Sequence, residues 1–269
     1  MPHIAETFRA LHVKGDPFLM VNVWDRGSAK MMAAMGAKAL ATSSAAHAFT
    51  MGRPDGGTVT RDEALAHAAE IVSVASVPVQ GDFENGFGDD PDTCAETVRM
   101  AAEVGLAGIC IEDIALPASE AYAFDLSVER IAAAAGAARA LPHDFVLTAR
   151  ADGIMTRAYD TDEAIRRLVA FEAAGADCLY APLPPDMEAL AQICAQTTAP
   201  VNALVAGPFT MQTQTAFAKI GVARLSVGSA LARITHRAIY DAAEAMLGDG
   251  DFAALKNGIS SDIIDDLLT

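Results

Sequence analysis

Short apolar segments alternate with longer alanine-rich segments along almost the whole chain, and this alternation constrains the fold more than any other feature. The short segments are rich in β-branched residues and predict strands over residues 18–23, 37–43, 77–83, 108–111, 145–150, 178–181, 201–205 and 224–227. The longer segments have helical spacing and predict helices over residues 26–35, 61–75, 91–104, 127–140, 162–174, 186–196, 210–219 and 228–247. Eight strands, each followed by a helix, predict an α/β fold of the (β/α)8 TIM-barrel type.

The joints between the predicted elements favour this barrel over an open doubly wound sheet. An open sheet usually carries a glycine-rich phosphate loop after its first strand, whereas this chain has Trp24-Asp25-Arg26 there. We expect one barrel domain over residues 1–247, which is within the size that a single core can organise. Residues 248–269 predict an amphipathic helical tail that packs on its own barrel or on a neighbouring one. Four helix-to-strand joints carry a glycine, at Gly36, Gly105, Gly175 and Gly221.

Charge and cysteine content exclude several classes of protein. The 269 residues include 19 lysines and arginines against 35 aspartates and glutamates, a formal net charge of −16. This field repels polyanions, so we expect no nucleic-acid partner. The four cysteines form no CxxC pair, which predicts neither a disulfide framework nor a zinc site. No apolar run suits a signal peptide or a membrane span, so we expect a cytoplasmic protein with no membrane partner.

Acidic residues follow several predicted strands, at the end where TIM barrels place their active sites. Asp82 and Glu84 end the third strand, Glu112 ends the fourth, and Asp55 lies in the loop after the second. Asp82 and Glu84 are two residues apart, so on an extended strand both point to the same face. Carboxylates that converge on one mouth repel each other unless a cation lies between them, and oxygen ligands favour Mg²⁺ or Mn²⁺. The pattern therefore predicts a metal site.

Arg150 closes the fifth predicted strand, which is otherwise apolar. Its guanidinium is a rigid fork that suits a carboxylate or an enolate oxygen. A structural ion pair with Asp152 or Glu112 is the alternative, and both roles are compatible. Because the net charge is strongly negative, an anionic substrate needs such a local cation or a metal.

Several motifs resemble the isocitrate lyase and phosphoenolpyruvate mutase superfamily, in its short bacterial branch. The resemblance extends from about residue 18 to residue 237. The motifs are the opening strand and turn at residues 22–25 (NVWD), the oxyanion segment at 43–45 (SSA), the G-x-P-D loop at 52–55, the D-x-[DE]-x-G-[YF]-G signature at 82–88 (DFENGFG), the I-E-D strand end at 111–113 and the arginine strand at 148–150 (TAR).

This resemblance implies roles for individual residues. Asp82 would bind Mg²⁺ directly, with its water shell held by Asp55, Glu84 and Glu112. Arg150 would contact the carboxylate or 2-oxo oxygen of a 2-oxo acid. The other residues expected to bind the substrate are Trp24, Ser43, Ser44, Ala45 and Asn202, with Asn202 on the far side. Such a site stabilises the enolate that remains when a bond to C3 breaks.

One departure bears on the reaction. Lyase members carry a K-[KR]-C-G-H loop after the I-E-D strand, and its cysteine acts as a general acid or base, but residues 114–125 contain no cysteine. The remaining candidates for proton transfer are Tyr122, in the segment that resembles the gating loop, and His47, three residues beyond Ser44.

The expected function is therefore Mg²⁺-dependent cleavage of a C–C or C–P bond in a small 2-oxo acid or phosphonate through a metal-stabilised enolate, as in an oxaloacetate decarboxylase or a phosphonopyruvate hydrolase or mutase. Two alternatives stay open: a catalytically reduced barrel that only binds a 2-oxo acid, and a methylisocitrate-type lyase that uses a proton donor other than cysteine. The apolar tail and the resemblance together predict a homodimer or homotetramer, in which neighbouring subunits exchange the last helix.

Overall fold

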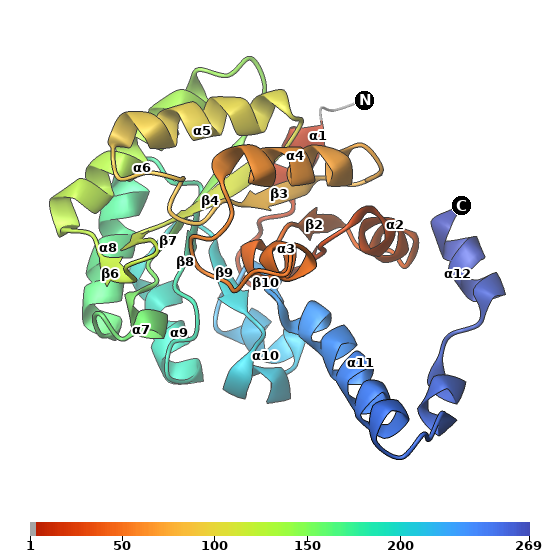
Figure 1. Ribbon diagram of the computed structural model, residues 1–269. Coiled ribbons are helices and arrows are strands. Elements are labelled where there is room, and N and C mark those ends of the chain that lie inside the picture. Colours follow the sequence, from red (N-terminus) through yellow and green to blue (C-terminus); the bar gives the residue numbers. More distant parts are fainter. Residues whose placement is uncertain (1–3) are drawn as a thin grey trace.

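Eight parallel strands form a closed ring with helices on its outside, which confirms the predicted (β/α)8 barrel (Figure 1). The computed structural model describes residues 4–269. Around the ring the order is β1-β10-β9-β8-β7-β4-β3-β2, so the first and last strands pair and close it. The barrel strands are β1 (Phe18–Asn22), β2 (Ala39–Ala41), β3 (Val79–Asp82), β4 (Gly108–Glu112), β7 (Val146–Arg150), β8 (Cys178–Tyr180), β9 (Val201–Leu204) and β10 (Arg224–Ser226).

Each predicted helix corresponds to a helix of the structure, and the region predicted over residues 210–219 is divided between the 3-10 helix η1 and α10. Elements that the periodicity did not predict are α1, α3, α7 and a small antiparallel hairpin made of β5 (Ile114–Ala115) and β6 (Glu120–Ala121), whereas the 3-10 helix η2 and α12 lie within the predicted helical tail. The helical elements are α1 (Ile4–Ala10), α2 (Arg26–Ala34), α3 (Ser44–Thr50), α4 (Arg61–Val72), α5 (Pro91–Glu103), α6 (Phe124–Arg139), α7 (Gly153–Thr156), α8 (Thr161–Ala173), α9 (Met187–Gln196), η1 (Gly207–Met211), α10 (Gln214–Lys219), α11 (Ala230–Gly248), η2 (Ala253–Asn257) and α12 (Ser261–Leu268).

Local sequence signals explain where these helices begin and end. Thr60 and Glu63 form a capping box at the start of α4, and Asp90 caps α5 with Pro91 at its first position. The four glycines of the helix-to-strand joints have φ between 88° and 104°, a backbone region that other residues rarely adopt. The chain therefore turns from helix to strand where the sequence predicts it.

The apolar core lies mainly between the strands and the surrounding helices. A second, smaller cluster fills the inside of the barrel at the amino ends of the strands, where α1 closes the ring. Phe8 of α1 packs edge-to-face against Phe18 of β1 there. This plug leaves only the opposite end of the barrel, at the carboxyl ends of the strands, open to a ligand.

The helix α11 and the segment after it extend away from the barrel (Figure 1). Beyond Ala232 the first half of α11 is exposed, and Ile234, Ile239 and Tyr240 are each 60–65% accessible. The tail then returns, and α12 lies beside α2, where Lys30 Nζ donates a hydrogen bond to the carbonyl of Leu268. No helix of the described residues is long and apolar enough to cross a membrane.

Candidate active site

A cavity of about 380 Å³ opens at the carboxyl ends of the barrel strands. Nine of the twelve predicted site residues line it, and they come from successive strand ends and from the loops that follow them. This convergence is what the barrel topology predicts for polar residues that end parallel strands. The nine are Ser43, Ser44, Ala45, Asp55, Asp82, Glu84, Glu112, Arg150 and Asn202.

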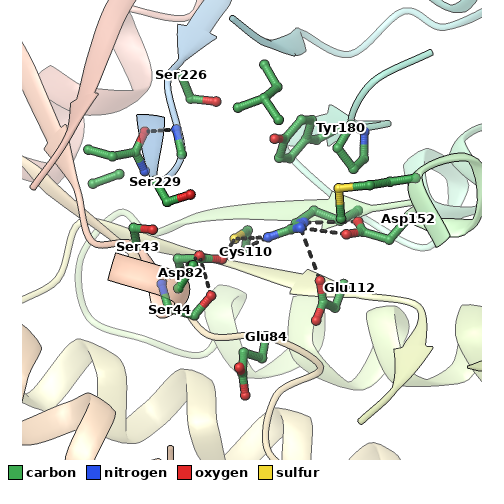
Figure 2. A pocket seen from close by; sticks show the side chains of 18 of the residues that line it. Ser43, Ser44, Asp82, Glu84, Cys110, Glu112, Asp152, Tyr180, Ser226 and Ser229 are labelled. Atoms are coloured by element: carbon green, nitrogen blue, oxygen red, sulfur yellow. Dashed lines mark hydrogen bonds and ion pairs between the residues drawn. The ribbon is translucent and has the colours of Figure 1, made fainter. Parts of the chain in front are cut away.

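Arg150 is the electrostatic centre of the cavity and contacts three carboxylates. Its Nη1 lies 2.8 Å from Asp82 Oδ1, and its Nη2 lies 3.1 Å from Glu112 Oε2. Asp152 takes the remaining side of the fork, with 3.0 Å from Nε to Oδ1 and 2.5 Å from Nη2 to Oδ2. Figure 2 shows these three carboxyl groups around the guanidinium. Burial alone would lower the pKa of Arg150, but the neighbouring carboxylates raise it well above its usual value, so its charge is permanent.

Asp82 ends β3 and has donors on both carboxylate oxygens. Oδ1 accepts from Arg150 and lies 3.2 Å from Cys110 Sγ, while Oδ2 accepts from the backbone N–H of Ser44 at 2.9 Å and from its hydroxyl at 2.8 Å. Ser44 is the first residue of α3, so the positive end of that helix faces Asp82. In this structure Ser44 therefore donates to Asp82 rather than into the cavity.

Glu84 reaches the cavity from a loop, and the expectation that it shares an extended strand with Asp82 is wrong. β3 ends at Asp82, and Glu84 has a left-handed backbone with φ of 45°. Its carboxylate accepts the N–H of Gly57 at 3.1 Å. Burial, followed by the nearby charges of Asp82 and Asp55, raises the pKa of Glu84 to about 7. Burial also raises the pKa of Glu112 well above its usual value, although Arg150 opposes this shift.

These carboxyl groups fit a hydrated divalent cation better than a fully dehydrated one. Within residues 4–269 no three potential ligands lie close enough together to hold one metal ion directly. Asp55 and Glu84 line the same cavity, however, and burial beside Asp82 raises the pKa of both. Carboxylates whose negative charge is not fully balanced by nearby cations suit Mg²⁺, which keeps several of its waters and is held by one or two direct ligands. The donor set thus fits the predicted arrangement of Asp82 as ligand with the other acids on the water shell.

Three predicted site residues do not line the cavity. His47 lies behind the Ser43–Ser44 segment, where its ring stacks on His67 at 3.8 Å, and burial lowers its pKa to about 4. Trp24 is also outside the cavity, and its carbonyl accepts a hydrogen bond from His67 Nε2. Tyr122 is fixed behind the wall and is described next. The roles predicted for these three residues stay predictions that the cavity geometry does not support.

Tyr122 is buried next to the loop that carries Glu84, not in the cavity. Its hydroxyl donates to Asp89 Oδ1 at 2.5 Å and accepts from Asn85 Nδ2 at 2.9 Å. Burial, and then the hydrogen bond to Asp89, raises the pKa of Tyr122 to about 12. A phenol with both bonds already made to protein groups is poorly placed to protonate a substrate.

Several lining residues were not predicted as part of the site. Cys110 is one of them: it lies two residues before Glu112 on β4, and this spacing puts both on the inner face. Asp152 was expected only as an alternative partner of Arg150, and it proves to be its bidentate partner. Tyr180, the last residue of β8, places its ring centre 5.1 Å from the Arg150 guanidinium.

Polar groups also form the floor and the far wall of the cavity. Arg224 is fully buried and donates to Asn202 Oδ1 at 2.9 Å, to Gln80 Oε1 at 2.8 Å and to Thr148 Oγ1 at 3.1 Å. Asn202 Nδ2 in turn donates to the hydroxyl of Ser226 at 2.9 Å. These bonds fix the Asn202 amide, whose orientation a substrate would meet.

The first and last strands are joined at the mouth of the cavity by a single side chain. Asn22, at the end of β1, accepts the backbone N–H groups of Val227 at 2.9 Å and of Gly228 at 2.8 Å. On the opposite side, the β5–β6 hairpin contributes Ile114 and the turn residues Leu116 and Ser119 to the wall. The cavity is thus enclosed partly by the barrel and partly by a hairpin that has no counterpart in the repeated βα unit.

Known proteins with the same architecture resemble this chain over most of its length. The sequence profile of the phosphoenolpyruvate phosphomutase family matches residues 8–247. An uncharacterized protein of Mycobacterium tuberculosis (strain ATCC 25618 / H37Rv) is 35% identical over 224 residues, which cover 83% of this chain and 82% of that protein. The oxaloacetate decarboxylase of Ectopseudomonas mendocina (strain ymp) is 29% identical over 245 residues, with coverage of 88% and 82%. A crystal structure of a candidate lyase/mutase from Burkholderia cenocepacia J2315 superposes with a TM-score of 0.93 at 45% identity and covers 97% of this chain and 94% of its own.

Proposed function

Because this chain belongs to the phosphoenolpyruvate phosphomutase family and is a lyase- or phosphonomutase-like enzyme, we propose that it uses Mg²⁺ or Mn²⁺ to break the bond that joins C3 of a small 2-oxo acid to a carbon or phosphorus atom. Decarboxylation of oxaloacetate and cleavage of phosphonopyruvate are the reactions that the cavity supports best. The observation that carries the proposal is the Arg150 cluster, in which one permanent cation lies among three carboxylates at the mouth of the barrel.

The protein's own residues bind and orient the substrate. We assign the carboxylate of the 2-oxo acid to the Ser43–Ala45 segment, where α3 begins. Binding there requires Ser44 to release Asp82, to which it donates in this structure. Arg150, which Asp152 holds in place, brings its positive charge to the carboxylate or 2-oxo oxygen. Asn202, held by Arg224, lines the far wall. Ile114 and Leu116 of the hairpin exclude water from the cavity and so strengthen these polar interactions.

Asp82 would hold a divalent cation directly, and Asp55, Glu84 and Glu112 would hold the water molecules around it. The cation would supply positive charge for the developing enolate oxygen. Proton transfer is the function for which the cavity is least equipped. Glu84 and Glu112 are assigned to the water shell of the metal. The other described residues that line the cavity include no histidine or lysine, and burial raises the pKa of both Cys110 and Tyr180. This composition favours cleavages that need mainly binding of the substrate carboxylate and stabilisation of the enolate. A methylisocitrate-type cleavage, by contrast, needs a positioned acid or base.

The test is a substrate comparison with purified protein and saturating Mg²⁺. Oxaloacetate, phosphonopyruvate, 2-methylisocitrate and 2,3-dimethylmalate are assayed side by side for kcat/KM, with an EDTA-treated sample as the control. We expect the highest value for oxaloacetate or phosphonopyruvate and no turnover in EDTA. If 2-methylisocitrate is the best substrate, the conclusion drawn from the missing proton donor is wrong. Absence of turnover with all four, together with tight binding of oxalate, would favour the barrel that only binds a 2-oxo acid.

A further inference from the structure

Arg130 of α6 is one of the most deeply buried side chains of the barrel, and its donors point at backbone carbonyls. It is 1% accessible. Its Nη2 donates to the carbonyl of Asn85 and, at 3.0 Å, to that of Gly88, and its Nη1 makes a longer contact of 3.4 Å to the carbonyl of Glu112. The first two carbonyls belong to the loop after β3, and the third belongs to the end of β4. One guanidinium thus joins the two segments that carry Glu84 and Glu112.

The Arg130 charge has no carboxylate partner within ion-pair distance among residues 4–269, which is unusual for a buried cation. Its Nε is buried without a hydrogen-bond partner. The guanidinium instead lies 4.0 Å from the centre of the Tyr122 ring. The neighbouring helix α8 offers a contrast, because Arg167 is also buried but pairs with Asp113 and Glu163. Arg130 therefore interacts mainly with backbone dipoles and an aromatic face.

The loop that Arg130 contacts has a backbone that needs support. Glu84 and Phe87 have φ of 45° and 65°, a left-handed region that is costly for residues other than glycine. Such a conformation persists only when the surrounding structure holds it. Side chains from outside the loop bind three of its carbonyls: Arg130 donates to those of Asn85 and Gly88, and Thr97 Oγ1 of α5 donates to that of Gly86 at 2.9 Å. The carbonyl of Glu84 accepts the N–H of Glu112 at 2.9 Å, which couples the loop to β4.

We propose that Arg130 is a positioning residue that clamps residues 84–88 against the end of β4 and thereby places the carboxyl groups of Glu84 and Glu112 in the cavity. Arg130 does not touch the cavity and acts only through these backbone carbonyls. A guanidinium suits this task because its fork serves several acceptors at once, whereas an ammonium is a point donor. The clamp is a property of the chain itself, while its effect on metal affinity rests on the function proposed above.

The experiment compares full-length wild type with Arg130→Met and Arg130→Lys, and with Arg139→Met as a control on the same helix. Arg139 is exposed and pairs with Asp177 at the far end of α6, so its loss should leave the loop unchanged. Amide hydrogen exchange without metal is followed for residues 84–88 and for the strands β7 and β8. Mn²⁺ affinity is measured from the electron paramagnetic resonance signal of the free ion. Both readouts are independent of any reaction.

We expect exchange of residues 84–88 to rise at least about tenfold in Arg130→Met, less in Arg130→Lys and not at all in Arg139→Met, with the strands unchanged. The Kd for Mn²⁺ should rise by about 10- to 100-fold in Arg130→Met, as is usual when an outer partner of a metal ligand is lost. Unchanged loop exchange, or a rise spread equally over the strands, would overturn the clamp. If Arg130→Met does not fold, the loop exchange of Arg130→Lys decides in the same way. If wild type binds no Mn²⁺, the metal part of the proposed function fails, and loop exchange alone decides the clamp.

Discussion

Replacing His12 by glutamine should make the protein less sensitive to acid. His12 lies beneath the floor of the cavity, where its Nε2 is 3.1 Å from Nη1 of Arg224 and its Nδ1 is 2.9 Å from the carbonyl of Phe8. Burial, and then the charge of Arg224, lowers the pKa of His12 from 6.5 to about 3. The folded protein thus keeps this ring neutral at a pH at which the unfolded chain protonates it. Its contribution to stability is complete above pH 6.5 and is lost as the pH falls toward 3.

The magnitude follows from the pKa difference. The pKa of His12 in the unfolded chain lies about 1.5 units above pH 5. At 1.36 kcal/mol per unit, protonation at pH 5 stabilises the unfolded chain by about 2 kcal/mol, and the folded protein has no such gain. Because the residue is half-buried and water screens part of this effect, we expect about 1–2 kcal/mol. Glutamine removes the titration, and its amide can still accept from Arg224.

The assay is urea unfolding at pH 7.5 and at pH 5.0, followed by the fluorescence of Trp24, the only tryptophan of the chain. The comparison at pH 7.5 measures the cost of the substitution itself, because His12 is neutral there in the folded protein and largely neutral in the unfolded one. Between the two pH values, wild type should lose about 1–2 kcal/mol more of its free energy of unfolding than His12→Gln. If both proteins lose the same amount, the neutral buried state of His12 is not what limits stability in acid.

Three further predictions concern the site and the assembly. Asp82→Ala, or EDTA, should abolish binding of oxalate in calorimetry, because a flat dianion reaches this acidic cavity through the cation; unchanged affinity in EDTA would contradict this. Arg150→Lys should lower kcat/KM by about 30-fold, since the loss of one charged hydrogen bond costs about 2 kcal/mol, and a variant within threefold of wild type would show that the fork is not needed. Light scattering should give a homodimer or homotetramer, because the exposed apolar side chains of α11 and the tail suit a second copy, and a mass near 28 kDa at micromolar concentration would refute this.

The barrel was predictable because each of its strands is a short apolar run followed by a helical period. The same periodicity predicts where the strands end. It therefore predicts that Asp82, Glu112 and Arg150 lie together at one end of the barrel. The short elements that lie outside this repeat escaped, since α3, α7 and the β5–β6 hairpin are too short to show a period of their own. The left-handed backbone at Glu84 was also hidden, because only the packing of its loop imposes it.

The side chains that support the site were the hardest to foresee. Arg130 and Arg224 are charged residues in a chain where charge normally indicates surface, and nothing in their local sequence signals burial. Tyr122 and His47 were predicted as site residues because each follows a strand end that carries other site residues, yet neither lines the cavity. The position of a residue in the sequence predicts which strand end it lies near. Tertiary packing decides whether its side chain lines the cavity or lies behind the cavity wall.

The two hydrogen bonds from Asn22 to Val227 and Gly228 have a consequence for how the protein is made. They join residues that are 205 and 206 positions apart, and they form the rim of the binding cavity. During synthesis the ring cannot close until β10 has left the ribosome, so a nascent chain that ends earlier has all of the acidic residues of the cavity but no enclosed site. Ligand binding is thus restricted to finished molecules, and retention of the chain on an immobilised oxalate analogue would separate completed barrels from truncated ones.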